Sequence, residues 1–311
     1  MISKNNVKEH QNAGDPGYKI LISVFHYDMK IVHSFWSKPF YERPSTSEKR
    51  KFLLTSFAFS CLQARKFYDN VELVTDKKGK DLLMEELGLP YTQCRTILDD
   101  VNEYETDIFS VGKIYAYANQ TEPFLHIDGD LFIWEKFNDT VEHSPLTVLH
   151  PEGYPLYSGG YIPIVEDIKL KFKYVPECLQ NLPSAKDIIA VNAAIMGGTD
   201  TSFYRRFGEE VFRFIDSNPE RKLMDPPWSF PVVFEQLLYY YLVEDKSDIN
   251  FYLAESAKLY SFSDTPDKNK VVHARSDQRT FAVLRALYNN MQLNYPEYNY
   301  RILNLAKTMS M

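Results

Sequence analysis

Short apolar runs alternate along the first half of the chain with longer segments whose apolar residues recur at helical spacing. The short runs are rich in β-branched residues and bounded by polar ones, which predicts buried strands. The strand candidates are 19–25, 71–75, 96–98 and 123–127. The helix candidates are 49–68, 76–87 and 107–119. Because strands and helices alternate, we predict a mainly parallel, doubly wound sheet with right-handed crossovers.

The second half of the chain has a less regular pattern. Its strand candidates are 146–149, 188–196, 249–253 and 271–274. Its helix candidates are 201–217, 231–243 and 279–309, the last with a break near Pro296. Residues 26–44 and 153–160 are predicted to be irregular. We therefore expect an α/β fold with helices flanking a mainly parallel central sheet, and an elaborated helical C-terminal part. Residues 1–17 are polar and predict a flexible tail, followed by a single domain over 18–311.

Composition narrows the class of protein. The hydrophobic fraction of 44% suffices for a substantial core, and the net charge of −7 without a long basic block argues against a nucleic-acid partner. Cys61, Cys94 and Cys178 are isolated, which fits a reducing compartment. The N-terminus has no apolar core typical of a signal peptide. The longest apolar stretch, 230–243, is too short for a membrane span. We expect a cytoplasmic protein with no transmembrane segment.

Two aspartates separated by one residue follow the strand candidate 123–127. In an open α/β sheet, ligands bind beyond the carboxyl ends of the strands. Alternate residues that leave a strand point the same way, so Asp128 and Asp130 could face one cation. Carboxylate oxygens suit Mg²⁺ or Mn²⁺, which typically bind substrate phosphates as well. The pattern favours a metal-diphosphate site, although a solvated turn could also carry two aspartates.

The segment 112–134, GKIYAYANQTEPFLHIDGDLFIW, resembles the central D-x-D motif of GT-A fold glycosyltransferases. The whole chain also resembles an uncharacterised bacterial family of glycosyltransferase-like proteins. The resemblance implies a GT-A-like (Rossmann-like) fold, in which Asp128 contacts the nucleotide ribose or the metal and Asp130 is the principal metal ligand. Lys113 matches a helix position that contacts the nucleotide, and an exposed helix lysine is the alternative.

The same resemblance implies a metal-dependent glycosyltransferase of the hexosyltransferase type. Its cofactor would be Mn²⁺ or Mg²⁺, its donor a nucleotide sugar (most simply a UDP-sugar), and its acceptor an unknown glycan, peptide or small molecule. On this basis, residues 18–134 form a nucleotide-binding half, 135–278 a donor-sugar and acceptor half, and 279–311 C-terminal helices.

Further site residues follow from the resemblance. His273, at the end of a strand candidate, matches a third metal ligand, and Arg275 is placed to neutralise phosphate. Asn192 matches a position that contacts the donor sugar or acceptor. His26 and Tyr27 match the place where the nucleotide base binds. Ala274 and Arg275 depart from the Gly and Lys that usually follow the histidine.

Other candidates come from the residues themselves. Glu235 lies in an apolar helix, where a carboxylate is costly to bury without a partner, so it is a candidate catalytic base. Asp76 could contact the donor nucleotide or cap the helix that follows it. Aromatic faces suit sugars, so the tyrosines of the 153–160 loop and its edge are acceptor-side candidates. These are Tyr154, Tyr157 and Tyr161.

Two other functions are also compatible with the sequence. Phosphohydrolases of the haloacid dehalogenase type also use Asp-x-Asp after a strand, but there the motif usually follows the first strand. A non-catalytic nucleotide- or sugar-binding protein with the same fold is the other alternative, since a fold alone does not guarantee activity.

Overall fold

The protein is described here by a computed structural model, which covers residues 29–153, 160–184, 187–219, 221, 224, 229–253, 270–274 and 281–308. The tail and the strand candidate 19–25 lie outside these residues. The first described elements are β1 (Lys30–Phe35) and α1 (Ser37–Glu42). The prediction of an irregular stretch over 26–44 was wrong here. His33 and Ser34 interrupt the apolar pattern, but both find hydrogen-bond partners inside the protein and are compatible with a buried strand.

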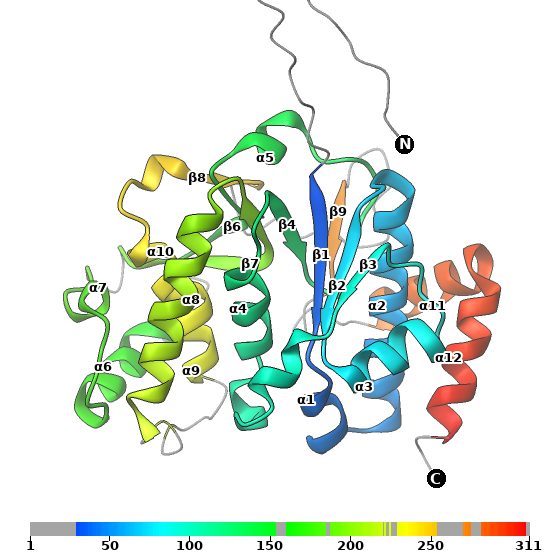
Figure 1. Ribbon diagram of the computed structural model, residues 1–311, viewed down its shortest axis with the longest axis horizontal. Helices are drawn as coiled ribbons and strands as arrows, with labels where there is room; N and C mark the ends of the chain where they lie inside the picture. Colours follow the sequence, from blue (N-terminus) through cyan, green and yellow to red (C-terminus); the bar gives the residue numbers. More distant parts are fainter. Residues whose placement is uncertain are drawn as a thin grey trace, which may run out of the picture.

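A seven-stranded sheet in the order β3-β2-β1-β4-β7-β6-β8 forms the centre of the molecule (Figure 1). Only β7 runs against its neighbours, pairing antiparallel with β4 and β6, while the other pairs are parallel. The expected mainly parallel central sheet is confirmed. The strands other than β1 are β2 (Val71–Thr75), β3 (Gln93–Arg95), β4 (Phe124–Ile127), β6 (Leu146–Gly153), β7 (Ile189–Gly198) and β8 (Ile249–Phe251).

Helices cover both faces of the sheet, and each face has its own buried cluster (Figure 1). On one face lie α4 (Val111–Ala118), α6 (Tyr161–Lys171), α7 (Glu177–Gln180), α8 (Thr201–Asp216), α9 (Ser229–Val232) and α10 (Leu238–Leu242). On the other lie α2 (Ser47–Phe67), α3 (Lys77–Lys80) with its π-helical continuation Asp81–Glu86, α11 (Phe281–Asn294) and α12 (Pro296–Thr308). None of the helices in the described ranges is long and apolar enough to cross a membrane.

Several element boundaries differ from those expected. The residues 96–98 were expected to be a strand, but β3 ends at Arg95 and a 3₁₀ helix spans Ile97–Val101. The helix candidate 231–243 is continuous, but its middle turn, Val233–Leu237, is π-helical. The short helices α5 (Asp139–His143), α6 and α7 were not predicted. α5 has 5 residues and α7 has 4, so local periodicity carried little signal in these two helices.

A second, two-stranded sheet pairs β5 (Leu131–Ile133) with β9 (Val271–His273) in antiparallel register. Leu131 lies opposite His273 in that register. β5 begins directly after the turn that follows β4, so this sheet places a C-terminal histidine beside the turn that carries the two aspartates. Nothing in the local pattern of either segment indicates this pairing.

Candidate active site

The turn between β4 and β5 carries Asp128 and Asp130. The Asp128 amide donates to Ala194 O at 2.9 Å, so the ladder with β7 extends one residue past the strand. The Leu131 amide then donates to Asp128 O at 3.0 Å and closes the turn. The Ala274 amide donates to Asp130 O at 2.8 Å and ties the turn to the end of β9. Three backbone hydrogen bonds therefore fix the backbone positions of Asp128 and Asp130, from which the two carboxylates extend.

Asp128, Asp130 and His273 converge at this turn. One ligand atom from each lies within 4.8 Å of those of the other two. Nε2 of His273 is 3.4 Å from Oδ1 of Asp130. The imidazole is buried, and among the described residues its Nδ1 has no hydrogen-bond partner. Two carboxylates and one imidazole form a ligand set that suits Mn²⁺ or Mg²⁺, and the residues fit a divalent cation.

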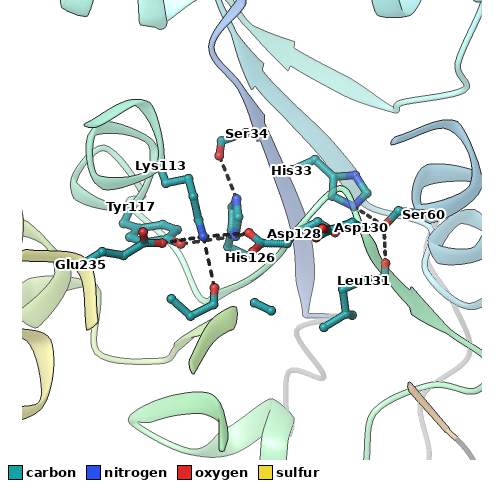
Figure 2. Close-up of polar contacts among 12 residues, drawn as sticks. His33, Ser34, Ser60, Lys113, Tyr117, His126, Asp128, Asp130, Leu131 and Glu235 are labelled. Atoms are coloured by element: carbon teal, nitrogen blue, oxygen red, sulfur yellow. Dashed lines mark hydrogen bonds and ion pairs between the residues drawn. The ribbon is translucent and has the colours of Figure 1, made fainter. Parts of the chain in front are cut away.

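Lys113 projects from α4 into the same site and joins two carboxylates. Its Nζ lies 2.8 Å from Asp128 Oδ1 and 2.5 Å from Glu235 Oε1. Figure 2 shows the ammonium group between these two acids. Burial by itself lowers the pKa of Lys113, but the Asp128 and Glu235 carboxylates outweigh it and raise that pKa well above its ordinary value. Lys113 is therefore a partly buried cation held between two acids, and an exposed helix lysine, the alternative considered from the sequence, is wrong.

Glu235 lies on the π-helical turn Val233–Leu237 and is buried. Burial raises the pKa of Glu235, and the Lys113 ammonium opposes that rise. The ion pair supplies the partner that a carboxylate in an apolar helix requires. The catalytic role expected for Glu235 stays a prediction. Lys113 contacts both Glu235 and Asp128, so Glu235 lies close to the turn that carries the two aspartates.

His126 was not identified from the sequence, although it lies two residues before Asp128 on β4. Its Nε2 is 2.9 Å from Ser34 Oγ and its Nδ1 is 4.0 Å from Asp128 Oδ1. Burial, then the charge of Lys113, lowers the pKa of His126, so the imidazole is neutral. Strand alternation could have found it, because residues two apart on a strand share a face.

Asn192 and Glu152 form a second buried polar pair, on β7 and β6. Asn192 Nδ2 donates to Glu152 Oε1 at 2.6 Å, and the Ala194 amide donates to Asn192 Oδ1 at 3.0 Å. The carbonyl oxygen of Ala194 accepts from the Asp128 amide, so Ala194 links this pair to the turn that carries the two aspartates. Glu152 was missed because its local sequence, next to Gly153, reads as the start of a loop. The donor contact predicted for Asn192 stays a prediction.

Asp76 directly follows β2 and is buried, and two backbone amides donate to its carboxylate. The Gly79 amide donates to its Oδ1 and the Ser37 amide to its Oδ2, each at 2.7 Å. It is the N-cap of α3, one of the two roles considered from the sequence, while its contact with a donor nucleotide stays untested. Tyr161 is buried and donates to Gln236 Oε1 at 2.7 Å.

Five residues considered from the sequence lie outside the described residues: His26, Tyr27, Tyr154, Tyr157 and Arg275. A surface hollow of about 670 Å³ lies elsewhere, between α8 and residues 242–248. None of the three clustered ligands lines it, so it does not define the site.

The family model described as "Family of unknown function (DUF6734)" matches residues 29–305. No curated protein matches the chain in sequence. Among solved structures, the chain is similar to the apo crystal structure of mouse xyloside xylosyltransferase 1, with 10% identity over 81% of this chain and 99% of that chain. The TM-score of 0.40 is too low for this likeness to bear on function.

Proposed function

We propose that this chain, which belongs to the family of unknown function (DUF6734), is a metal-dependent glycosyltransferase that uses a nucleotide-sugar donor. The observation that carries the proposal is the convergence of Asp128, Asp130 and His273 within 4.8 Å at the carboxyl edge of the sheet. The resemblance of residues 112–134 to the GT-A motif supports the same assignment. The motif directly follows the carboxyl end of β4, the edge at which open α/β sheets commonly bind ligands, and this also supports the proposal.

The three ligands suit a hard divalent cation. Mn²⁺ or Mg²⁺, held by Asp128, Asp130 and His273, would supply charge stabilisation for the departing nucleoside diphosphate. Contacts within the chain hold two of these ligands in place. Asp128 is oriented by the Lys113 ammonium, and Asp130 is fixed through its backbone bond to Ala274.

Lys113 and Glu235 lie next to Asp128 on one side of the turn that carries the two aspartates. Lys113 Nζ also lies 3.4 Å from the carbonyl oxygen of Ala193, the residue that follows Asn192 on β7. We assign this side to the donor sugar, whose hydroxyls suit an ammonium and a carboxylate. We assign to the Glu235 carboxylate the role of the base that accepts a proton from an acceptor hydroxyl, with the Lys113 ammonium controlling its charge.

The donor is tested with the purified chain and a panel of nucleoside diphosphates, with and without Mn²⁺. A ligand that binds only the folded state raises its stability, by about 2.7 kcal/mol at a hundred times its Kd. We expect one nucleotide, UDP in the simplest case, to raise Tm only when Mn²⁺ is present. The matching nucleotide sugar should then be hydrolysed or transferred.

Variants decide whether the assigned residues carry the activity. Asp130→Asn and His273→Ala should lose the Mn²⁺-dependent shift and the donor cleavage, whereas Asp248→Asn, at an exposed aspartate, and His143→Ala, on α5, should retain both. Unchanged Mn²⁺ dependence in Asp130→Asn would refute the metal site. Binding without cleavage of any sugar donor would support a non-catalytic protein, and cleavage of simple phosphate esters alone a phosphohydrolase.

A further inference from the structure

A serine from α2 supports the turn that carries the two aspartates. Ser60 Oγ donates to Leu131 O at 2.6 Å and lies 3.4 Å from Asp128 O. Figure 2 shows this hydroxyl between His33 and the turn. Ser60 is completely buried, and Leu131 is 71 residues away in sequence. The bond therefore joins a helix to the turn and contributes nothing to the helix's own ladder.

The hydrogen atoms of this contact can be assigned. A hydroxyl has one hydrogen, and a carbonyl oxygen can only accept. Since Ser60 gives its hydrogen to the turn, it must accept from His33, whose Nε2 is 2.9 Å away. Burial lowers the pKa of His33 to about 3, so the ring is neutral at ordinary pH. Its hydrogen is then on Nε2, and Nδ1 carries a lone pair.

Tyr91 completes the chain at the other nitrogen. Its hydroxyl is 3.1 Å from His33 Nδ1, and with the tautomer assigned above it must donate. Burial, reinforced by the neighbouring Cys61, raises the pKa of Tyr91 well above its ordinary value, so its hydrogen is retained. Donation runs in one direction, from Tyr91 through His33 and Ser60 to Leu131 O. Every member is buried, and chains of this kind strengthen each bond in them.

We propose that His33 and Ser60 are positioning residues for the metal site, which hold the turn so that Asp128 and Asp130 can share one cation. The inference rests on the metal site of the proposed function. It follows from the placement of the Ser60 contacts, which fall on the carbonyls of Asp128 and Leu131 and so bracket Asp130. Groups that orient metal ligands from outside the ligand set commonly change metal affinity by about 10- to 100-fold when removed.

A neighbouring serine shows that this contact is not a general property of the helix. Ser56 lies one turn earlier on α2, is also buried, and donates to Phe52 O within the helix at 2.8 Å. Each alanine variant removes one buried hydroxyl and the hydrogen bond that it donates, and Ser60→Ala also removes the acceptor of the His33 bond. Only Ser60 contacts the turn, so Ser56→Ala is a matched control for Ser60→Ala.

The test uses two readouts on the full chain. Mn²⁺ affinity is measured by isothermal titration, and exchange of the Leu131 amide hydrogen is measured without metal. We expect Ser60→Ala to weaken Mn²⁺ binding about tenfold and to speed exchange at Leu131, while Ser56→Ala changes neither. The ring nitrogens of His33 in wild type should give the NMR signature of a neutral ring with hydrogen on Nε2.

A second pair of variants applies if Ser60→Ala fails to fold. His33→Phe removes both ring contacts, whereas the amide of His33→Gln can still donate to Ser60 and accept from Tyr91. We expect His33→Phe to weaken Mn²⁺ binding and His33→Gln to recover most of it. Wild-type affinity and exchange in folded Ser60→Ala or His33→Phe would overturn the inference. If the wild-type chain binds Mn²⁺ but cleaves no sugar donor, the proposed function fails. The effects of Ser60→Ala and His33→Phe on Mn²⁺ affinity and on exchange at Leu131 still test this inference separately.

Discussion

Lys113 Nζ lies 2.8 Å from Asp128 Oδ1, so one carboxylate of the Asp128, Asp130 and His273 cluster is also the partner of a partly buried ammonium. The same ammonium contacts Glu235, on a helix far away in sequence. A lysine held by two acids is rigid, and Asp128 is therefore oriented before a cation arrives. Through Lys113, the charge of Asp128 is therefore coupled to the charge of Glu235.

We predict that Lys113→Met destabilises the protein by about 3 kcal/mol, because it leaves the buried Glu235 carboxylate without its cation. Glu235→Gln should cost less, since Lys113 keeps Asp128. The free energy of unfolding is measured by urea titration for both variants and for the double variant. We expect the loss of stability in the double variant to be smaller than the sum of the losses in the two single variants. Additive losses would show that the two side chains do not interact.

His33 should make the protein less stable in acid. Its pKa is about 3 in the folded protein and about 6.5 when unfolded, so between these values the unfolded chain binds more protons. The contribution of His33 to the free energy of unfolding is therefore fully present above about pH 6.5. It falls as the pH is lowered, by up to about 1.4 kcal/mol per pH unit. Urea unfolding of wild type and His33→Gln near neutral pH and near pH 5 measures the difference. An equal loss in both proteins would contradict the assignment of a buried, neutral imidazole.

Asn192→Asp should introduce a pH dependence that wild type lacks at this position. The substitution places a second carboxyl 2.6 Å from Glu152, and two buried carboxyls so close share a proton, which raises the pKa of the pair. Stability from the shared proton is present at low pH and is lost as the pH rises through the folded value. We expect the Tm of this variant to fall between about pH 5 and pH 8 relative to wild type. Asn192→Ser, which adds no charge, is the control, and parallel Tm curves for the two variants would contradict the pairing.

The local pattern of the sequence determined most of the regular elements. The limits of β2 match the expected strand, and β4, α2, α8 and the C-terminal helix pair fall within a few residues of the predictions. Periodicity is a property of neighbouring residues, so it survives without knowledge of the fold. The position of Asp128 and Asp130 after a buried strand was predicted for the same reason.

Only the tertiary structure decided which residues share the site. β1 was missed because His33 and Ser34 look polar in sequence and are satisfied only by Ser60, Tyr91 and His126 from other elements. The meeting of His273 with Asp130 depends on strand register, and that of Lys113 with Glu235 on how α4 packs against the helix that follows α9. Such contacts join residues far apart in the chain. Their geometry is set by packing across the sheet, which no local spacing encodes.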